Sequence, residues 1–186
     1  MPSGDLQSKI NRAIRAVLIS AGAGTLNDTY AAPASDDRQL PNTTIITGDG
    51  IPFSGPGNWH FPEVTVLLRD SAVVQPATDA ANTPRISANS RMTAVINALT
   101  LSDNISSLYY TAQQITALGR ALAVDPTNGS NPIAAQSALD NADMSDFTCL
   151  WWDVTSNGQP KKSENGAYWE RELGFSCIAC NASIPA

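Results

Sequence analysis

The closing stretch of the chain decides the fold, and it reads Tyr168-Trp169-Glu170-Arg171-Glu172-Leu173-Gly174-Phe175-Ser176-Cys177-Ile178-Ala179-Cys180-Asn181. Alternate residues form one face that is apolar except at Arg171: Trp169, Leu173, Phe175, Cys177 and Ala179. The opposite face begins polar and turns apolar near its end: Glu170, Glu172, Gly174, Ser176, Ile178 and Cys180. A period of two over this length predicts a long, half-buried β-strand.

A second strand is predicted at residues 147–154, which read Phe-Thr-Cys-Leu-Trp-Trp-Asp-Val. Residues 155–160 are rich in turn-forming residues, and residues 161–166 extend that turn. The strands at 147–154 and 168–181 are therefore expected to form a long antiparallel hairpin with a wide tip.

Two amphipathic helices are predicted. Apolar side chains recur at helical spacing in residues 5–22, and Lys9, Arg12 and Arg15 are expected on a solvated polar side. A similar apolar stripe predicts the second helix at residues 103–124.

The remaining segments are less regular. Residues 61–70 alternate as a strand does, whereas residues 71–90 are predicted to be a polar loop. Residues 91–101 fit a helical template but also fit a strand buried on both faces, and we predict a strand. Residues 23–60 are rich in Gly, Pro and Asn and hold one short predicted strand at 43–47. So long a connection predicts an extended arm or lid that contacts something outside its own core.

The element order is therefore helix, strand, strand, helix, strand, strand. It predicts an α+β fold whose mainly antiparallel sheet has a long C-terminal hairpin and is covered on one face by two helices, with long loops. Residues 1–186 are expected to be a single domain, with a helix at 5–22, the extended arm at 23–60 and a core at 61–186.

Composition excludes several classes of function. The 186 residues carry a net charge of -6, which argues against nucleic acid as a binding partner because such affinity depends on Lys and Arg at phosphates. No apolar run approaches the roughly 20 residues of a membrane span, and no signal-peptide pattern opens the chain. Three cysteines are too few for a disulfide framework, so a reducing cytoplasm is the expected place of synthesis.

The single histidine, His60, lies between Trp59 and Phe61. No Gly-x-Ser-x-Gly elbow accompanies it, so an ordinary loop histidine is the better interpretation. The glycine-rich residues 48–50 and 54–57 lack the features of phosphate-binding and calcium-binding loops.

Cys177 and Cys180 match a C-x-x-C motif by their letters alone. Positions three apart on a strand face opposite sides, so buried thiols are expected rather than a redox or zinc pair. Cys149 could lie across the hairpin from Cys177, but the register cannot be read from sequence. Glu170 and Glu172 share a strand face, which could pair carboxylates for acid and base roles, yet a solvated or interface-facing strand is the better interpretation. No catalytic, cofactor-binding or metal-binding residue is predicted, and we do not expect an enzyme.

The layout resembles the tail terminator, or tail-completion, proteins of long-tailed bacteriophages. The pattern consists of an N-terminal amphipathic helix, a long excursion into Phe61-Pro62-Glu63-Val64-Thr65-Val66, the segment Asn89 to Ile96, a helix at 105–123 and the closing strand from Tyr168. The resemblance spans most of the chain, which departs from the family in its long loops at 23–60 and 71–90.

The resemblance implies a virion structural protein that is made in the host cytoplasm and acts by assembly. Such subunits form a ring, expected to be a hexamer, that caps the tail tube and joins it to the head connector. The implied partners are further copies of the chain, the tail tube protein and the connector or stopper protein. DNA would pass through the lumen without specific binding, which an acidic subunit would favour. Alternatives are another neck, tail-tube or capsid-decoration protein, or a small hydrolase that uses His60.

Overall fold

The computed structural model describes residues 3–21, 29–30, 40–52, 59–71, 83–100, 112–120, 144 and 146–181. These residues form an α+β fold with the following elements: α1 (Ser3–Ser20), β1 (Thr29–Tyr30), β2 (Asn42–Thr47), β3 (Ile51–Pro52), β4 (Trp59–Phe61), β5 (Glu63–Ser71), α2 (Thr83–Thr100), β6 (Phe147–Asn157), β7 (Lys161–Lys162) and β8 (Tyr168–Asn181). Residues 112–120 form a further helical segment.

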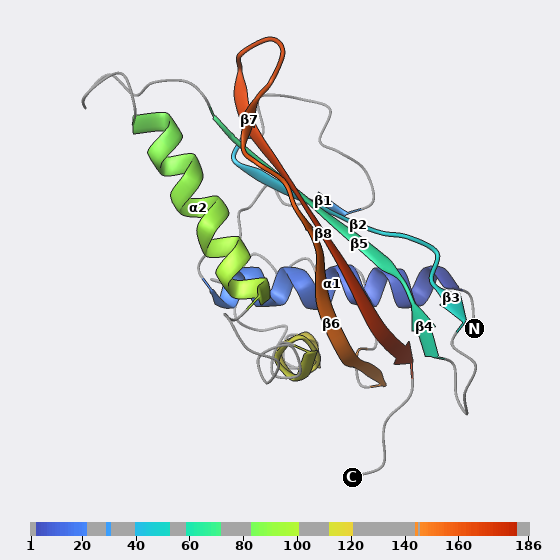
Figure 1. Ribbon diagram of the computed structural model, residues 1–186. Coiled ribbons are helices and arrows are strands. Elements are labelled where there is room, and N and C mark those ends of the chain that lie inside the picture. The colour runs from blue at the N-terminus through green and yellow to red at the C-terminus, as the bar shows by residue number, and fades with distance from the viewer. Residues whose placement is uncertain are drawn as a thin grey trace.

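The strands make one sheet in the order β1-β2-β5-β8-β4-β3, and β6 and β7 pair with β8. All pairings are antiparallel except that of β1 with β2. β8 is the central strand, because residues such as Phe175 pair with Val64 of β5 on one edge and Val154 of β6 on the other. The predicted strand at 168–181 and the C-terminal hairpin are confirmed, as Figure 1 shows.

β4 and β5 act as one long strand along β8. The register that pairs Trp59 with Cys180 continues without a shift to Glu63 and Ser176. Pro62 interrupts the strand because it lacks an N–H donor, but its carbonyl still accepts a hydrogen bond from the Cys177 N–H at 3.2 Å. This continuity aligns the side chains of β4 with those at the end of β8.

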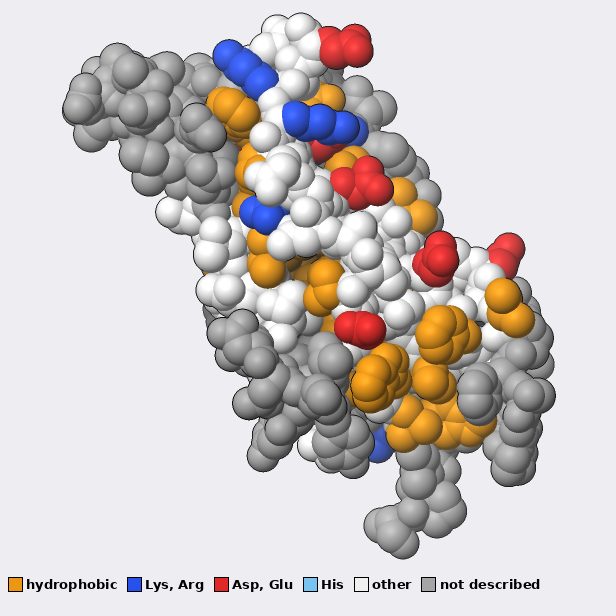
Figure 2. All heavy atoms as spheres, in the orientation of Figure 1, with side chains coloured by type: hydrophobic (Ala, Val, Ile, Leu, Met, Phe, Trp, Pro, Cys, Tyr) orange, Lys and Arg blue, Asp and Glu red, His pale blue; other side chains and the backbone are white. Residues whose placement is uncertain are grey.

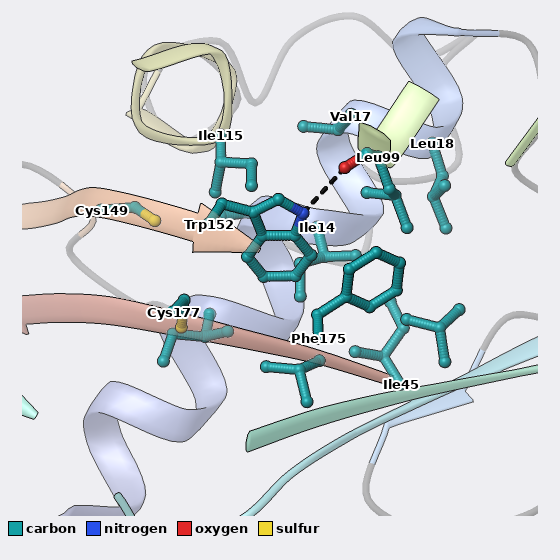
Figure 3. Packing of buried hydrophobic residues seen from close by; sticks show 14 of the residues in the cluster. Ile14, Val17, Leu18, Ile45, Leu99, Ile115, Cys149, Trp152, Phe175 and Cys177 are labelled. Carbon is teal, nitrogen blue, oxygen red and sulfur yellow. Dashed lines mark hydrogen bonds between the residues drawn. The ribbon is translucent and has the colours of Figure 1, made fainter. Parts of the chain in front are cut away.

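One face of the sheet, which we call the inner face, packs against the helices. The apolar face of β8 is buried there as predicted, with Leu173, Phe175 and Cys177 in the same core cluster as residues of α1, α2 and the segment 112–120. Trp152 stacks on Phe175 with ring centroids 4.7 Å apart, and its indole N–H donates to the Leu99 carbonyl at 2.8 Å (Figure 3). This bond satisfies a terminal carbonyl of α2 and fixes that helix on the sheet.

The prediction of a strand at residues 91–101 is wrong, since α2 continues to Thr100. Met92, Val95 and Leu99 are buried, whereas Thr93 and Asn97 are exposed, which is helical spacing. The sequence looked apolar on both faces because α2 contacts α1 as well as β5. The same helix begins within the predicted loop at 71–90, and Pro84 lies in its first turn, where proline is tolerated.

The predicted helix at 5–22 is confirmed as α1, but its expected solvated basic side is not. Lys9 and Arg15 are buried, at 4% and 1% exposure, and Arg12 is half-buried. The Lys9 ammonium pairs with the Asp146 carboxylate at 2.6 Å. Helix 112–120 covers α1 so closely that a Cβ added at Gly119 would come within 2.9 Å of the Cβ of Ala13. α1 therefore lies between two layers of the protein instead of on its surface.

The predicted helix at 103–124 is helical over residues 112–120, and the rest of that range lies outside the described residues. The predicted strand at 43–47 is confirmed as β2. Within the expected arm at 23–60, residues 42–47 are a sheet strand with Ile45 fully buried, so this part is core rather than arm. Residues 22–28, 31–39 and 53–58 lie outside the described residues.

The hairpin tip is narrower than predicted, because residues 155–157 belong to β6 and residues 161–162 to β7. β6 runs to Asn157, and register shifts after Cys149 and Val154 accommodate the irregular residues as β-bulges. Gly158 continues the pairing, and a Cβ at this position would lie 2.7 Å from the Glu172 carbonyl oxygen. The chain reverses only between Ser163 and Tyr168, whose N–H and carbonyl groups bond at 2.9 Å.

Candidate assembly surface

His60 lies beside a backbone carbonyl group. It lies on β4 opposite Ala179 and Pro52 and is half-buried. Its Nδ1 lies 3.4 Å from the Gly50 carbonyl oxygen, and this is the polar contact of the imidazole within the described part of the chain. A backbone carbonyl can orient an imidazole, but it supplies neither the nucleophile nor the carboxylate of a catalytic triad.

The three thiols are free and buried, as was predicted for Cys177 and Cys180. Cys177 belongs to the inner core and faces Trp152, while Cys180, three residues on, faces Thr148 and Trp59. Cys149 pairs with Ala179 rather than directly with Cys177. A hydrogen bond to Cys177, followed by burial, raises the pKa of Cys149 well above that of an ordinary thiol. The thiol is therefore kept protonated, which is unlike a metal ligand or a nucleophile. The described residues contain no cluster of three His, Cys, Asp or Glu suited to a metal ion.

Glu170 and Glu172 have different environments. The Glu170 carboxylate accepts a hydrogen bond from Arg69 at 2.9 Å and lies 3.6 Å from the Lys161 ammonium. Glu172 is exposed. Arg171, on the other face, donates to the Gly158 carbonyl and to Asn157. Glu170 is thus held in an ion-pair network that positions the hairpin.

The face of the sheet opposite the helices, the outer face, carries an apolar row across four strands. Ile51 pairs with Phe61, and Ile178 pairs with Trp151. The shared register of β4 and β5 places Phe61 opposite Ile178, so the four residues form one line. Ile51 is 74% exposed, Phe61 41% and Trp151 36%. Contiguous exposed apolar residues on a sheet face are typical of protein interaction sites.

The neighbouring line of residues on the outer face is an acidic row, made of Glu63, Ser176 and Asp153. Ser176 pairs with Glu63 on one side and Asp153 on the other. Glu63 is exposed and Asp153 half-buried, while Ser176 is largely buried between them. Figure 2 shows hydrophobic side chains gathered at the lower end of this face beside acidic ones. The apolar row and the acidic row together form the candidate assembly surface.

The open edge of β6 is partly blocked. The Thr116 hydroxyl accepts from the Cys149 N–H at 2.9 Å and lies 3.2 Å from its carbonyl oxygen. Arg120 donates to the Phe147 carbonyl at 2.8 Å and to the Thr148 hydroxyl. A neighbouring strand cannot pair here without displacing helix 112–120. This stretch of the β6 edge is therefore occupied within the chain itself.

The hairpin tip carries charges of both signs, with Lys161 and Lys162 beside Glu164 and Glu170. Lys161 and Lys162 form β7 and are both exposed, with the Lys161 side chain at 70% exposure. They line an open cavity of about 480 Å³ together with Glu164, Asn165 and Tyr168. Figure 2 shows lysine or arginine side chains near this upper end of the molecule.

The sequence predicted that Glu170, Glu172 and Ser176 share the polar part of one strand face. Of these, Ser176 lies in the surface described above. Phe61 and Trp151 were not singled out, since their alignment depends on pairing between distant strands. Their signal was an apolar residue at a position where the alternation predicts an outward side chain.

None of the described helices is both long and apolar enough to cross a membrane. Comparison with models of protein families gives no match, and no curated protein matches the chain in sequence.

Proposed function

We propose that the protein is a virion structural protein of the tail terminator type, which caps the tail tube and joins it to the head connector as a ring. It acts by assembly rather than by catalysis. The observation that carries this proposal is the exposed apolar row of Ile51, Phe61, Ile178 and Trp151, which fits a permanent protein contact better than a solvated surface.

Two further features support the proposal. Of the layout that resembles tail terminators, the N-terminal helix and the long closing strand are present, whereas the segment at 91–100 is a helix. The net charge of -6 suits a subunit that lines a channel for DNA, because like charges limit contacts with phosphate. The partners in this account are further copies of the chain, the tail tube protein and the connector protein, and the protein lies in the neck of the particle.

Imaging of phage particles made without this protein tests the proposal. We expect tails of uncontrolled length or heads without joined tails, and normal joined particles would reject it. Labelling the protein in complete particles separates the related structural roles. A six-fold ring at the head–tail junction is expected, whereas many copies over the head would indicate a decoration protein.

A further inference from the structure

The candidate assembly surface has the chemistry of a site for lysine side chains. Phe61 and Trp151 offer aromatic faces on which the alkyl stem of a lysine can lie and with which its ammonium can interact. Glu63 and Asp153, one row away, offer carboxylates to the same ammonium groups. An apolar row beside an acidic row therefore matches a partner with paired, exposed lysines better than a purely apolar partner.

The chain itself presents such a pair. Lys161 and Lys162 are adjacent and exposed at the hairpin tip, where Lys161 pairs with Glu170 and Lys162 with Trp169, so their side chains leave opposite sides of the hairpin and can straddle a bound surface. The turn that follows is fixed by Gly166, whose φ of 74° favours glycine. The Lys161 ammonium lies 3.6 Å from Glu170 Oε1, beyond hydrogen-bond distance, and the Lys161 side chain is 70% exposed, so it can take another partner.

The two surfaces cannot meet within one molecule. Lys162 lies opposite Trp169, and the apolar row crosses β8 at Ile178. Those positions are about 30 Å apart along the strand at about 3.3 Å per residue. Figure 1 shows the hairpin tip and β3–β4 at opposite ends of the sheet. Any contact between them joins two copies.

We propose that the apolar row and the acidic row of one copy receive Lys161 and Lys162 from the hairpin tip of a second copy. This inference rests on the proposed self-assembly and names the contact that produces it. The two surfaces differ, so the contact is head-to-tail and extends into a closed ring when the rotation between copies permits.

Charge reversal on each side tests this contact. The first variant carries Lys161→Glu and Lys162→Glu, and the second carries Glu63→Lys and Asp153→Lys. Each replaces attraction by repulsion, so we expect self-association of either variant alone to weaken at least about tenfold. An equimolar mixture of the two should regain association, because each altered surface then meets its altered complement. Sedimentation equilibrium over a range of concentrations provides the measurement.

Thr93→Lys with Asn97→Lys is the matched control, since both positions are exposed on α2, away from the outer face. This variant should associate as the wild type does. Circular dichroism checks that every variant is folded, and Ile51→Ser provides a second, milder disruption at the most exposed residue of the row.

For a wild type that associates, three results would overturn the contact: wild-type association in both reversed variants, weakening in only one of them, or no recovery in the mixture. Weaker association only in the variant with Glu63→Lys and Asp153→Lys would assign the surface to a basic partner other than the hairpin tip. A wild-type ring that survives both reversals rejects this contact but leaves the proposed function intact. A wild type that is monomeric at all concentrations also rejects the contact, while particle imaging decides the proposed function separately.

Discussion

The two faces of the central sheet carry similar side chains in opposite environments. On the inner face Trp152 and Phe175 are almost completely buried under the helices. On the outer face Trp151 and Phe61 remain exposed on the same strands or their neighbours. The difference teaches that apolar content alone does not define the core. The inner aromatic residues stabilise the fold, and we assign the outer ones to association.

The largest effect is expected on the inner face. Phe175→Ala removes the ring that stacks on Trp152 and should lower the free energy of unfolding by about 3–5 kcal/mol. Phe61→Ala is the matched change on the outer face and should lower it by less than about 1 kcal/mol. Denaturant titration of both variants, at concentrations where the protein is monomeric, measures the difference. Equal decreases in the free energy of unfolding for the two variants would contradict the claim that only the inner face stabilises the fold.

The covering of α1 is tested by Gly119→Ala. The added Cβ would lie 2.9 Å from the Cβ of Ala13, so the helices must separate slightly, at a cost of about 1–3 kcal/mol. Gly48→Ala is the control, because the nearest atom to its new Cβ is 3.6 Å away. Similar melting temperatures for the two variants would show that α1 is less closely covered than described.

A smaller effect is expected from Cys149 on the inner face. Its pKa is raised, first by the hydrogen bond to Cys177 and then by burial, so the folded protein holds the thiol proton more tightly than the unfolded chain does. The resulting stability is complete below the ordinary thiol pKa and is lost as the pH rises through the raised value. The free energy of unfolding should therefore fall more steeply at alkaline pH in the wild type than in Cys149→Ala. Parallel curves for the two proteins would contradict this.

The inner face was largely predictable from sequence, because the alternation from Leu173 to Ala179 specifies which side chains are buried. The helix α2 was not. Its buried residues Met92, Val95 and Leu99 are interleaved with partly buried Ala94 and Ile96, so helix and strand periods could not be separated. The burial of Lys9 and Arg15 also escaped prediction, since it depends on distant segments that pack over α1.

The outer surface could be predicted only in part. The alternation placed Ser176 and Ile178 on the outer side of the last strand, but their neighbours across the sheet come from three other strands. Aligning Ile51, Phe61 and Trp151 requires the exact pairing of those strands, including the bulge between Cys149 and Trp151. The length of the hairpin strands was also underestimated, because turn-forming residues near the tip suggested an earlier end. A β-bulge accommodates an extra residue in β6 while the pairing with β8 continues.

The most direct test of the central claim is the self-association of Ile51→Ser with Phe61→Ser, measured by sedimentation equilibrium beside the wild type. The account predicts association at least about tenfold weaker, with the free energy of unfolding of the monomer changed by less than about 1 kcal/mol. Unchanged association of this variant would contradict the assignment of the outer face to assembly.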